Sequence, residues 1–261
     1  KVYNGITRRP VTFIGIASGK GGVGKSTVTA NLAYRFMKKG FHVGVIDADI
    51  YGSSIPTLLE MEHQNPKMDY NKKILPLKKQ SIEVISTEFF TKPGQAVIWR
   101  GGMLNSMLNH FFYDVKWRPD TKFVIIDFPP GTGDIHLSII SELKIDGAVI
   151  VSTPQQVAVA DVVRGVEMFR NPNVNIPVLG VVENMAWFTP AELPNNRYYI
   201  FGKGGAARYA EEVGVDLLGE VPIIQDIMQG ADDGVPAVNT VSQVAEVYQQ
   251  VARKVVDKME K

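Results

Sequence analysis

The stretch GKGGVGKS, residues 19–26, has the residue types and spacing of a phosphate-binding loop. Closely spaced glycines let the backbone turn tightly and point successive N–H groups at an anion. In such a loop Lys25 would contact the β- and γ-phosphates of a nucleotide, and the Ser26 hydroxyl would be a ligand for Mg²⁺. A second lysine, Lys20, lies inside the same turn, where the general pattern requires none.

Two acidic stretches, DADIYGSS from residue 47 and DFPPGTGD from residue 127, each follow an apolar run. We expect Asp127 to hold Mg²⁺ through water and Asp49 to orient or deprotonate the attacking water. The glycines after Asp127 predict a loop that responds to a γ-phosphate. Two alternatives stay open, since Asp47 could only cap a turn and Asp134 could be the N-cap of a helix.

Seven short apolar runs predict strands. Their apolarity is continuous rather than alternating, which is typical of strands covered on both faces. We therefore expect an α/β fold with a doubly wound, mostly parallel sheet and helices on both faces, forming a single domain over residues 11–261 after an N-terminal extension of residues 1–10. The runs cover residues 11–18, 42–49, 82–87, 123–129, 147–153, 176–184 and 215–222.

Helical periodicity predicts two amphipathic helices that pack on this sheet. One apolar stripe follows the glycine-rich loop and the other lies near the C-terminus, where a polar face of Gln, Glu, Asp and Lys argues against membrane binding. Residues 60–80 and 187–201 are interpreted as surface loops. The stripes are Val28, Leu32, Ala33 and Phe36, and then Val241, Val244, Tyr248, Val251 and Val255.

Composition narrows the classes of partner and compartment. The 261 residues carry a formal net charge of +1, so nucleic-acid binding would need a local basic patch. No apolar run reaches the roughly 18 residues of a membrane span, and we expect a cytoplasmic protein without a membrane partner. The sequence has no cysteine, which fits a reducing compartment and removes thiolate metal sites.

Six motifs in order carry a resemblance to a known family. They are KGGVGKS, DADIYGSSIP, DFPPGTGD, TPQQVAVADV, VENM and IFGKGGA, spread from about residue 20 to about residue 206. Together they resemble the Mrp/NBP35 (ApbC) family of P-loop ATPases, which includes iron–sulfur cluster carriers and belongs to the deviant-Walker-A class of MinD and ParA.

The resemblance implies roles for individual residues. Lys20 would reach the phosphates of a second subunit, as an arginine finger does, so that ATP drives formation of a homodimer. The alternative is a solvated loop lysine. Asn184 resembles the asparagine that hydrogen-bonds adenine, although it could be a turn residue, and the segment from Pro222 resembles the other wall of the base pocket. Gly21 to Thr27 would form the phosphate cradle. The nucleotide-binding residues of the loop would be Gly19, Lys20, Gly21, Gly22, Val23, Gly24, Lys25, Ser26 and Thr27, and the metal ligands would be Ser26, Asp49 and Asp127.

One departure from the family concerns the iron–sulfur cluster. Many members carry a C-x-x-C pair shortly after the VENM motif, and here that region reads AWFTPAELPNNRYYIFG. A cluster needs thiolates or an occasional histidine, and the four histidines are scattered, so each is interpreted as a surface or turn residue. Cluster binding is therefore doubtful, and the aromatic residues of 187–201 could form an apolar contact with a partner or pack on their own domain. We expect an ATPase that serves iron–sulfur proteins, or alternatively an ATP-switched regulator of DNA or another macromolecule.

Overall fold

An eight-stranded sheet forms the centre of the protein in a computed structural model that describes residues 11–91, 101–190, 192–224 and 242–260. The strands run in the order β10-β9-β8-β1-β7-β2-β6-β5, and all neighbours are parallel except β5 and β6. The predicted mostly parallel sheet is confirmed. The strands are β1 (Thr12–Ala17), β2 (His42–Asp47), β5 (Leu77–Lys79), β6 (Ile82–Ser86), β7 (Thr121–Asp127), β8 (Gly147–Ser152), β9 (Val178–Thr189) and β10 (Leu217–Ile224).

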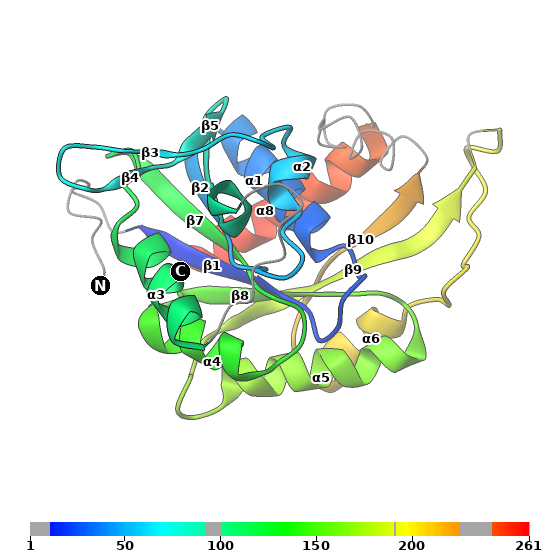
Figure 1. The fold of residues 1–261 in the computed structure, drawn as a ribbon. Helices are drawn as coiled ribbons and strands as arrows, with labels where there is room; N and C mark the ends of the chain where they lie inside the picture. Colours follow the sequence, from blue (N-terminus) through cyan, green and yellow to red (C-terminus); the bar gives the residue numbers. More distant parts are fainter. Residues whose placement is uncertain (1–10, 92–100, 191, 225–241, 261) are drawn as a thin grey trace.

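Helices cover both faces of the sheet (Figure 1), as predicted. One face is packed by α1 (Lys25–Lys38) and α8 (Ser242–Met259), and short α2 (Ile55–Leu58) lies on the same side. The other face is packed by α3 (Gly101–Tyr113), α4 (Asp134–Glu142), α5 (Gln156–Arg170) and α6 (Gly205–Glu212). A 3₁₀ turn, η1 (Thr87–Phe90), follows β6.

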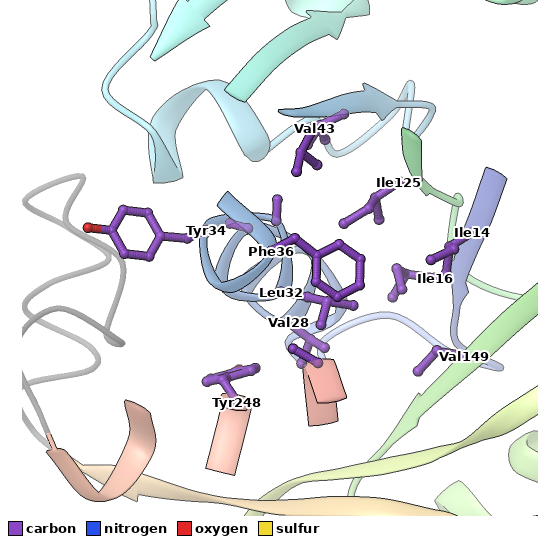
Figure 2. Close-up of a cluster of buried hydrophobic side chains, with 14 of the residues drawn as sticks. Ile14, Ile16, Val28, Leu32, Tyr34, Phe36, Val43, Ile125, Val149 and Tyr248 are labelled. Atoms are coloured by element: carbon purple, nitrogen blue, oxygen red, sulfur yellow. The ribbon is translucent and has the colours of Figure 1, made fainter. Parts of the chain in front are cut away.

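The core beneath α1 confirms the first predicted helical stripe (Figure 2). Val28, Leu32 and Phe36 are fully buried, and the Phe36 ring lies 4.8 Å from the Phe123 ring of β7. Tyr248 reaches the same cluster from α8, together with the other described members of the C-terminal stripe. Val241 lies outside the described residues.

The interpretation of residues 60–80 as a loop is partly wrong. This stretch contains β3 (Lys67–Met68) paired with β4 (Ile74–Leu75), and β5 at the edge of the main sheet. Strands of two or three residues are too short to show an alternating pattern. Residues 187–201 also begin in a strand, because β9 continues to Thr189 and Phe188 forms a bridge with Tyr198.

A buried carboxyl group caps α6. The N-cap residue of this helix is Gly204, which has no side chain, and Glu183 Oε2 on β9 accepts a hydrogen bond from the Ala206 N–H at 2.7 Å. The other oxygen, Oε1, is buried and has no hydrogen-bond partner within the described parts of the chain. Burial raises the pKa of Glu183, and the Ala206 N–H opposes that rise only in part.

This raised pKa makes stability depend on pH. Stabilisation by protonated Glu183 should be complete below the unfolded pKa of about 4.3 and be lost as pH rises through the higher folded pKa. Glu183→Gln keeps an acceptor for the Ala206 N–H without this titration. We therefore expect the free energy of unfolding of the variant, relative to the unmodified protein, to increase between pH 5 and pH 8 in urea denaturation. A pH-independent difference would contradict the assignment.

Candidate nucleotide-binding site

The glycine-rich loop links β1 to α1 at the carboxyl end of the sheet. Gly22 and Gly24 have φ angles of +77° and +79°, a region that other residues rarely adopt. A Cβ atom at Gly24 would also lie 2.2 Å from Asn184 Nδ2, so the loop is packed closely against β9. Because α1 begins at Lys25, its first N–H groups face the cavity without partners in the helix.

The loop lines a cavity of about 440 Å³. A volume of this size is in the range of small-molecule sites. Residues 20–27 and Asp49 all contribute to the wall, together with Ser18, Tyr51, Gly52, Ser54 and Pro130. Gly19 lies just outside it, packed so closely on Asp161 of α5 that a Cβ atom would be 2.2 Å from that side chain.

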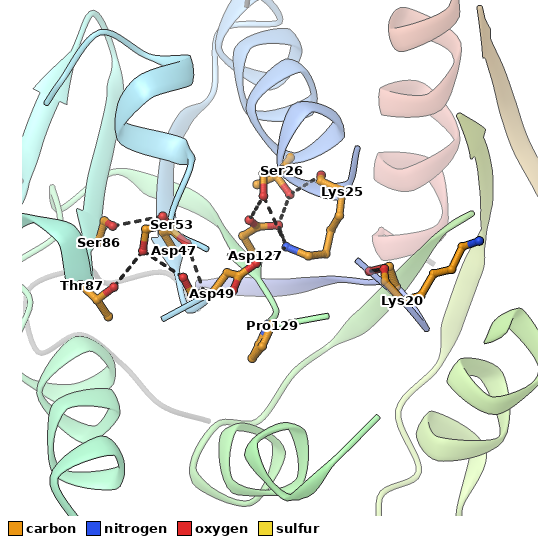
Figure 3. A network of polar contacts seen from close by, with 12 residues as sticks. Lys20, Lys25, Ser26, Asp47, Asp49, Ser53, Ser86, Thr87, Asp127 and Pro129 are labelled. Atoms are coloured by element: carbon orange, nitrogen blue, oxygen red, sulfur yellow. Dashed lines mark hydrogen bonds and ion pairs between the residues drawn. The ribbon is translucent and has the colours of Figure 1, made fainter. Parts of the chain in front are cut away.

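Lys25 provides the cation of the cavity (Figure 3). Its side chain is only 6% exposed, and Nζ lies 2.8 Å from Asp127 Oδ1 and 3.8 Å from Asp49 Oδ2. An ammonium group at this depth requires anionic partners, and these carboxylates supply them.

Asp127 has two further donors from α1. Ser26 Oγ donates to Oδ2 at 2.5 Å, and Thr29 Oγ1 lies 2.8 Å from Oδ1. Thr29 was not among the predicted site residues, although it lies four residues after Lys25 and therefore on the same helical face. These contacts fix the carboxylate at the end of β7.

The register of the sheet brings a second carboxyl group to the same place. Asp47 ends β2 and is paired with Asp127 across β2 and β7. It is fully buried and accepts hydrogen bonds from Ser86 Oγ at 3.0 Å and the Asp49 N–H at 3.2 Å. The turn role considered for Asp47 is therefore present. Burial, and then the charge of Asp127, raise the pKa of Asp47 well above its usual value.

Asp49 lies at the edge of the cavity, between the buried carboxyls and solvent. Burial raises its pKa, and the charge of Lys25 opposes that rise. The loop after Asp49 is tied to the 3₁₀ turn η1, because Ser53 Oγ donates to the Asp49 carbonyl and contacts Thr87 Oγ1 at 2.8 Å. A carboxylate with a raised pKa is a better proton acceptor.

Lys20 points away from Lys25 and the carboxylates (Figure 3). Its Nζ donates to Gln155 Oε1 at 3.2 Å, at the start of α5. The two lysines of the loop are thus separated, one buried at the bottom of the cavity and one directed towards the neighbouring loop. Gln155, in the TPQQ motif, is a second residue whose position the spacing alone did not indicate.

Asn184 and Pro222 are not among the residues that line the cavity. Asn184 Nδ2 donates to the Val23 carbonyl at 2.9 Å, and Pro222 is buried on β10, beside β9. The stretch that follows, residues 225–241, lies outside the described residues. The predicted adenine contacts of Asn184 and Pro222 stay predictions.

Two other expectations need correction. Gly133, not Asp134, is the N-cap of α4, because the helix already begins at Asp134, one residue earlier than an N-cap role for Asp134 would require. The interpretation of all histidines as surface or turn residues is wrong for His136, which is 1% exposed. It lies on the inner face of α4, whose first turn is too short for periodicity to reveal this.

The donor set fits a hard cation bound with a nucleotide. Ser26, Asp49 and Asp127 offer the oxygen ligands that Mg²⁺ prefers, and Mg²⁺ usually takes its remaining ligands from phosphates and water. In contrast, no group of three or more His, Cys, Asp or Glu side chains in the described ranges could hold a metal ion by itself. The site therefore suits a metal ion that arrives with phosphate oxygens.

Comparisons with known proteins agree with this geometry. A family model described as ParA: NUBPL iron-transfer P-loop NTPase matches residues 10–256. An iron–sulfur cluster carrier protein of Aquifex aeolicus is 42% identical over 245 residues, covering 92% of this chain and 66% of that protein. An iron–sulfur protein required for NADH dehydrogenase in Arabidopsis thaliana mitochondria is 41% identical over 247 residues, covering 94% of this chain and 77% of that protein. The chain thus spans about two thirds of the length of the Aquifex relative.

Solved structures show the same fold. A nucleotide-binding protein from Archaeoglobus fulgidus, in complex with ADP, has a TM-score of 0.73 at 38% identity, with 85% of this chain and 86% of that chain covered. The cell-division ATPase MinD of Pyrococcus furiosus has a TM-score of 0.68 at 22% identity, covering 95% and 99% of the two chains. Across the described residues, no helix combines the length and apolarity needed to cross a bilayer.

The Thr29 contact can be tested by an isosteric change. Thr29→Val keeps the shape and removes the donor to buried Asp127, so we expect a loss of about 1–3 kcal/mol in the free energy of unfolding. Urea denaturation would measure it. Thr29→Ser, which keeps the hydroxyl and loses a methyl group, is the matched control. A valine variant as stable as the unmodified protein would show that the hydroxyl contributes nothing.

Proposed function

Because the chain belongs to the family of NUBPL iron-transfer P-loop NTPases, we propose that it is a slow, Mg²⁺-dependent ATPase. The observation that carries this proposal is Lys25, buried at the bottom of a glycine-lined cavity and held 2.8 Å from Asp127. Such a lysine can exchange part of its carboxylate contact for phosphate oxygens when ATP enters. The ADP complex of the Archaeoglobus relative supports nucleotide binding in this fold.

Each residue of the cavity has a separate proposed role. Lys25 and the loop N–H groups bind the β- and γ-phosphates, while Ser26 and Asp127 hold Mg²⁺. Bound Mg²⁺ neutralises charge on the phosphate oxygens. Asp49 orients the attacking water and accepts its proton. For the base, Asn184 is proposed to contact adenine while its Nδ2 holds the Val23 carbonyl, with the segment from Pro222 as the second wall.

Lys20 is proposed to act on the nucleotide of a second copy of the chain. In the structure its Nζ is directed away from Lys25 and the carboxylates of its own cavity. This direction favours a contact with the phosphates of a neighbouring subunit over a contact with its own nucleotide. A cation supplied across an interface stabilises charge that develops during phosphoryl transfer. ATP would then promote a homodimer, and hydrolysis would loosen it.

The physiological role is proposed to be iron–sulfur protein maturation. Relatives at about 40% identity are named iron–sulfur cluster carriers, but this sequence has no cysteine. Thiolates are the usual ligands of such clusters. The cluster cargo would therefore be held by the thiolates of a partner protein, while this chain supplies the ATP-driven change. The near-neutral charge gives less support to a regulator of DNA.

The catalytic and trans roles of the two lysines are tested together. We expect Lys25→Ala to lose nucleotide binding and turnover, and Lys20→Ala to keep ADP binding while its turnover falls about a thousandfold. Mixing the two variants should restore activity, because the site with intact Lys25 receives Lys20 from the other subunit. Turnover is measured as phosphate release, with Lys39→Ala, at the exposed C-cap lysine that follows α1, as the control.

Two outcomes would contradict these roles. Undiminished turnover in Lys25→Ala would defeat the assignment of the cavity. Full loss of activity in Lys20→Ala without recovery on mixing would place Lys20 in its own subunit's site. The control at Lys39 should bind ADP and release phosphate like the unmodified protein.

Cluster binding is tested by anaerobic reconstitution with iron and sulfide. We expect the chain alone to gain no stable visible absorption, because it offers no thiolate. Colour that survives desalting would show that carboxylate or imidazole ligands hold a cluster, against the proposed role of partner thiolates.

A further inference from the structure

His136 is buried directly behind the loop that follows Asp127. It lies in the first turn of α4 and is 1% exposed. Its ring stacks on Phe128, with centroids 5.6 Å apart and an interplanar angle of 20°. The roles proposed above for the cavity make no use of this side chain.

The imidazole makes one directed contact with the loop. Nε2 lies 2.8 Å from the Pro129 carbonyl oxygen, which can only accept, so Nε2 carries the proton and donates. The other nitrogen, Nδ1, is buried and has no hydrogen-bond partner in the parts of the chain that the structure describes. Burial lowers the pKa of His136, although the Pro129 and Gly133 carbonyls oppose this, so the ring is neutral near pH 7.

The accepting carbonyl belongs to the peptide bond between Pro129 and Pro130. Neither proline has a backbone N–H. The nearest backbone donors are therefore the Phe128 N–H, which binds the Ile16 carbonyl, and the Gly131 N–H, which binds the Ser18 carbonyl. The Pro129 carbonyl is thus the group through which the middle of the loop is held. Fixing it sets the plane of the peptide that leads into Pro130.

That peptide reaches the nucleotide cavity. Pro130 is exposed, lines the cavity, and lies 3.9 Å from the Cβ position of Gly21 in the phosphate loop. A rotation of the Pro129–Pro130 peptide would therefore displace the wall that faces the phosphates. Asp127, held independently by α1, would stay in place.

We propose that His136 is a positioning residue for phosphoryl transfer, which holds the Pro129–Pro130 peptide so that the loop faces the terminal phosphate of bound ATP. This inference rests on the proposed ATPase function. It assigns His136 to the transition from bound to reacting nucleotide, and not to nucleotide affinity. Removal of the donated hydrogen bond should then change kcat more than KM.

The test compares two substitutions of similar length. His136→Met removes the donor, and we expect kcat for ATP to fall about tenfold while KM and ADP affinity change by less than about twofold. His136→Gln restores a donor, and its kcat should recover to within about threefold of the unmodified protein. His110→Met, at an exposed histidine of α3, is the matched control and should be unchanged.

Equal kcat in His136→Met and the unmodified protein, or equal loss in both His136 variants, would overturn the proposal. If His136→Met does not fold, nuclear magnetic resonance of the unmodified protein with labelled histidine rings locates the ring proton of His136. A proton on Nε2 upholds the inference, and a proton on Nδ1 overturns it. If the unmodified protein releases no phosphate, the proposed function fails separately. The ring-labelled spectrum then tests the contact of Nε2 with the Pro129 carbonyl independently of turnover.

Discussion

The interaction on which the site depends is the ion pair between buried Lys25 and Asp127. An ammonium group at this depth is stable only with compensating negative charge, and Asp127 is itself held by Ser26 and Thr29. A phosphate that displaces part of this pair leaves Asp127 beside a second anion. A divalent cation between the two removes that repulsion, so nucleotide and Mg²⁺ are expected to enter the cavity as a unit.

The parallel sheet is what concentrates these charges. Because β2 and β7 are neighbours and in register, Asp47 and Asp127 end their strands side by side, next to the strand that leads into the phosphate loop. The cost of two adjacent buried carboxyls is reduced by the raised pKa of Asp47, which favours its neutral form. The fold thus places these carboxyl groups at the carboxyl end of the sheet, and Lys25 of α1 supplies the opposite charge.

Those parts of the fold and site that depend on a local sequence pattern could be predicted from the sequence. Continuous apolar runs located the seven long strands, and the spacing of glycine, lysine and serine located the loop around Lys25. Such patterns did not reveal β3 to β5, whose two or three residues carry no period, or the contacts of Thr29 and Gln155, which depend on how distant elements meet. His136 was misread because nothing in the local sequence shows which side of a short helix faces the sheet.

The contact between Gly24 and Asn184 limits the order in which these two residues can be substituted during evolution. Replacement of Gly24 is opposed twice, by the clash with the amide and by its positive φ angle. Replacement of Asn184 by a smaller residue removes the hydrogen bond to the Val23 carbonyl and the proposed contact with adenine, but it causes no clash. Divergence at this pair is therefore one-directional, and a descendant that had lost the glycine would be expected to have lost the asparagine first.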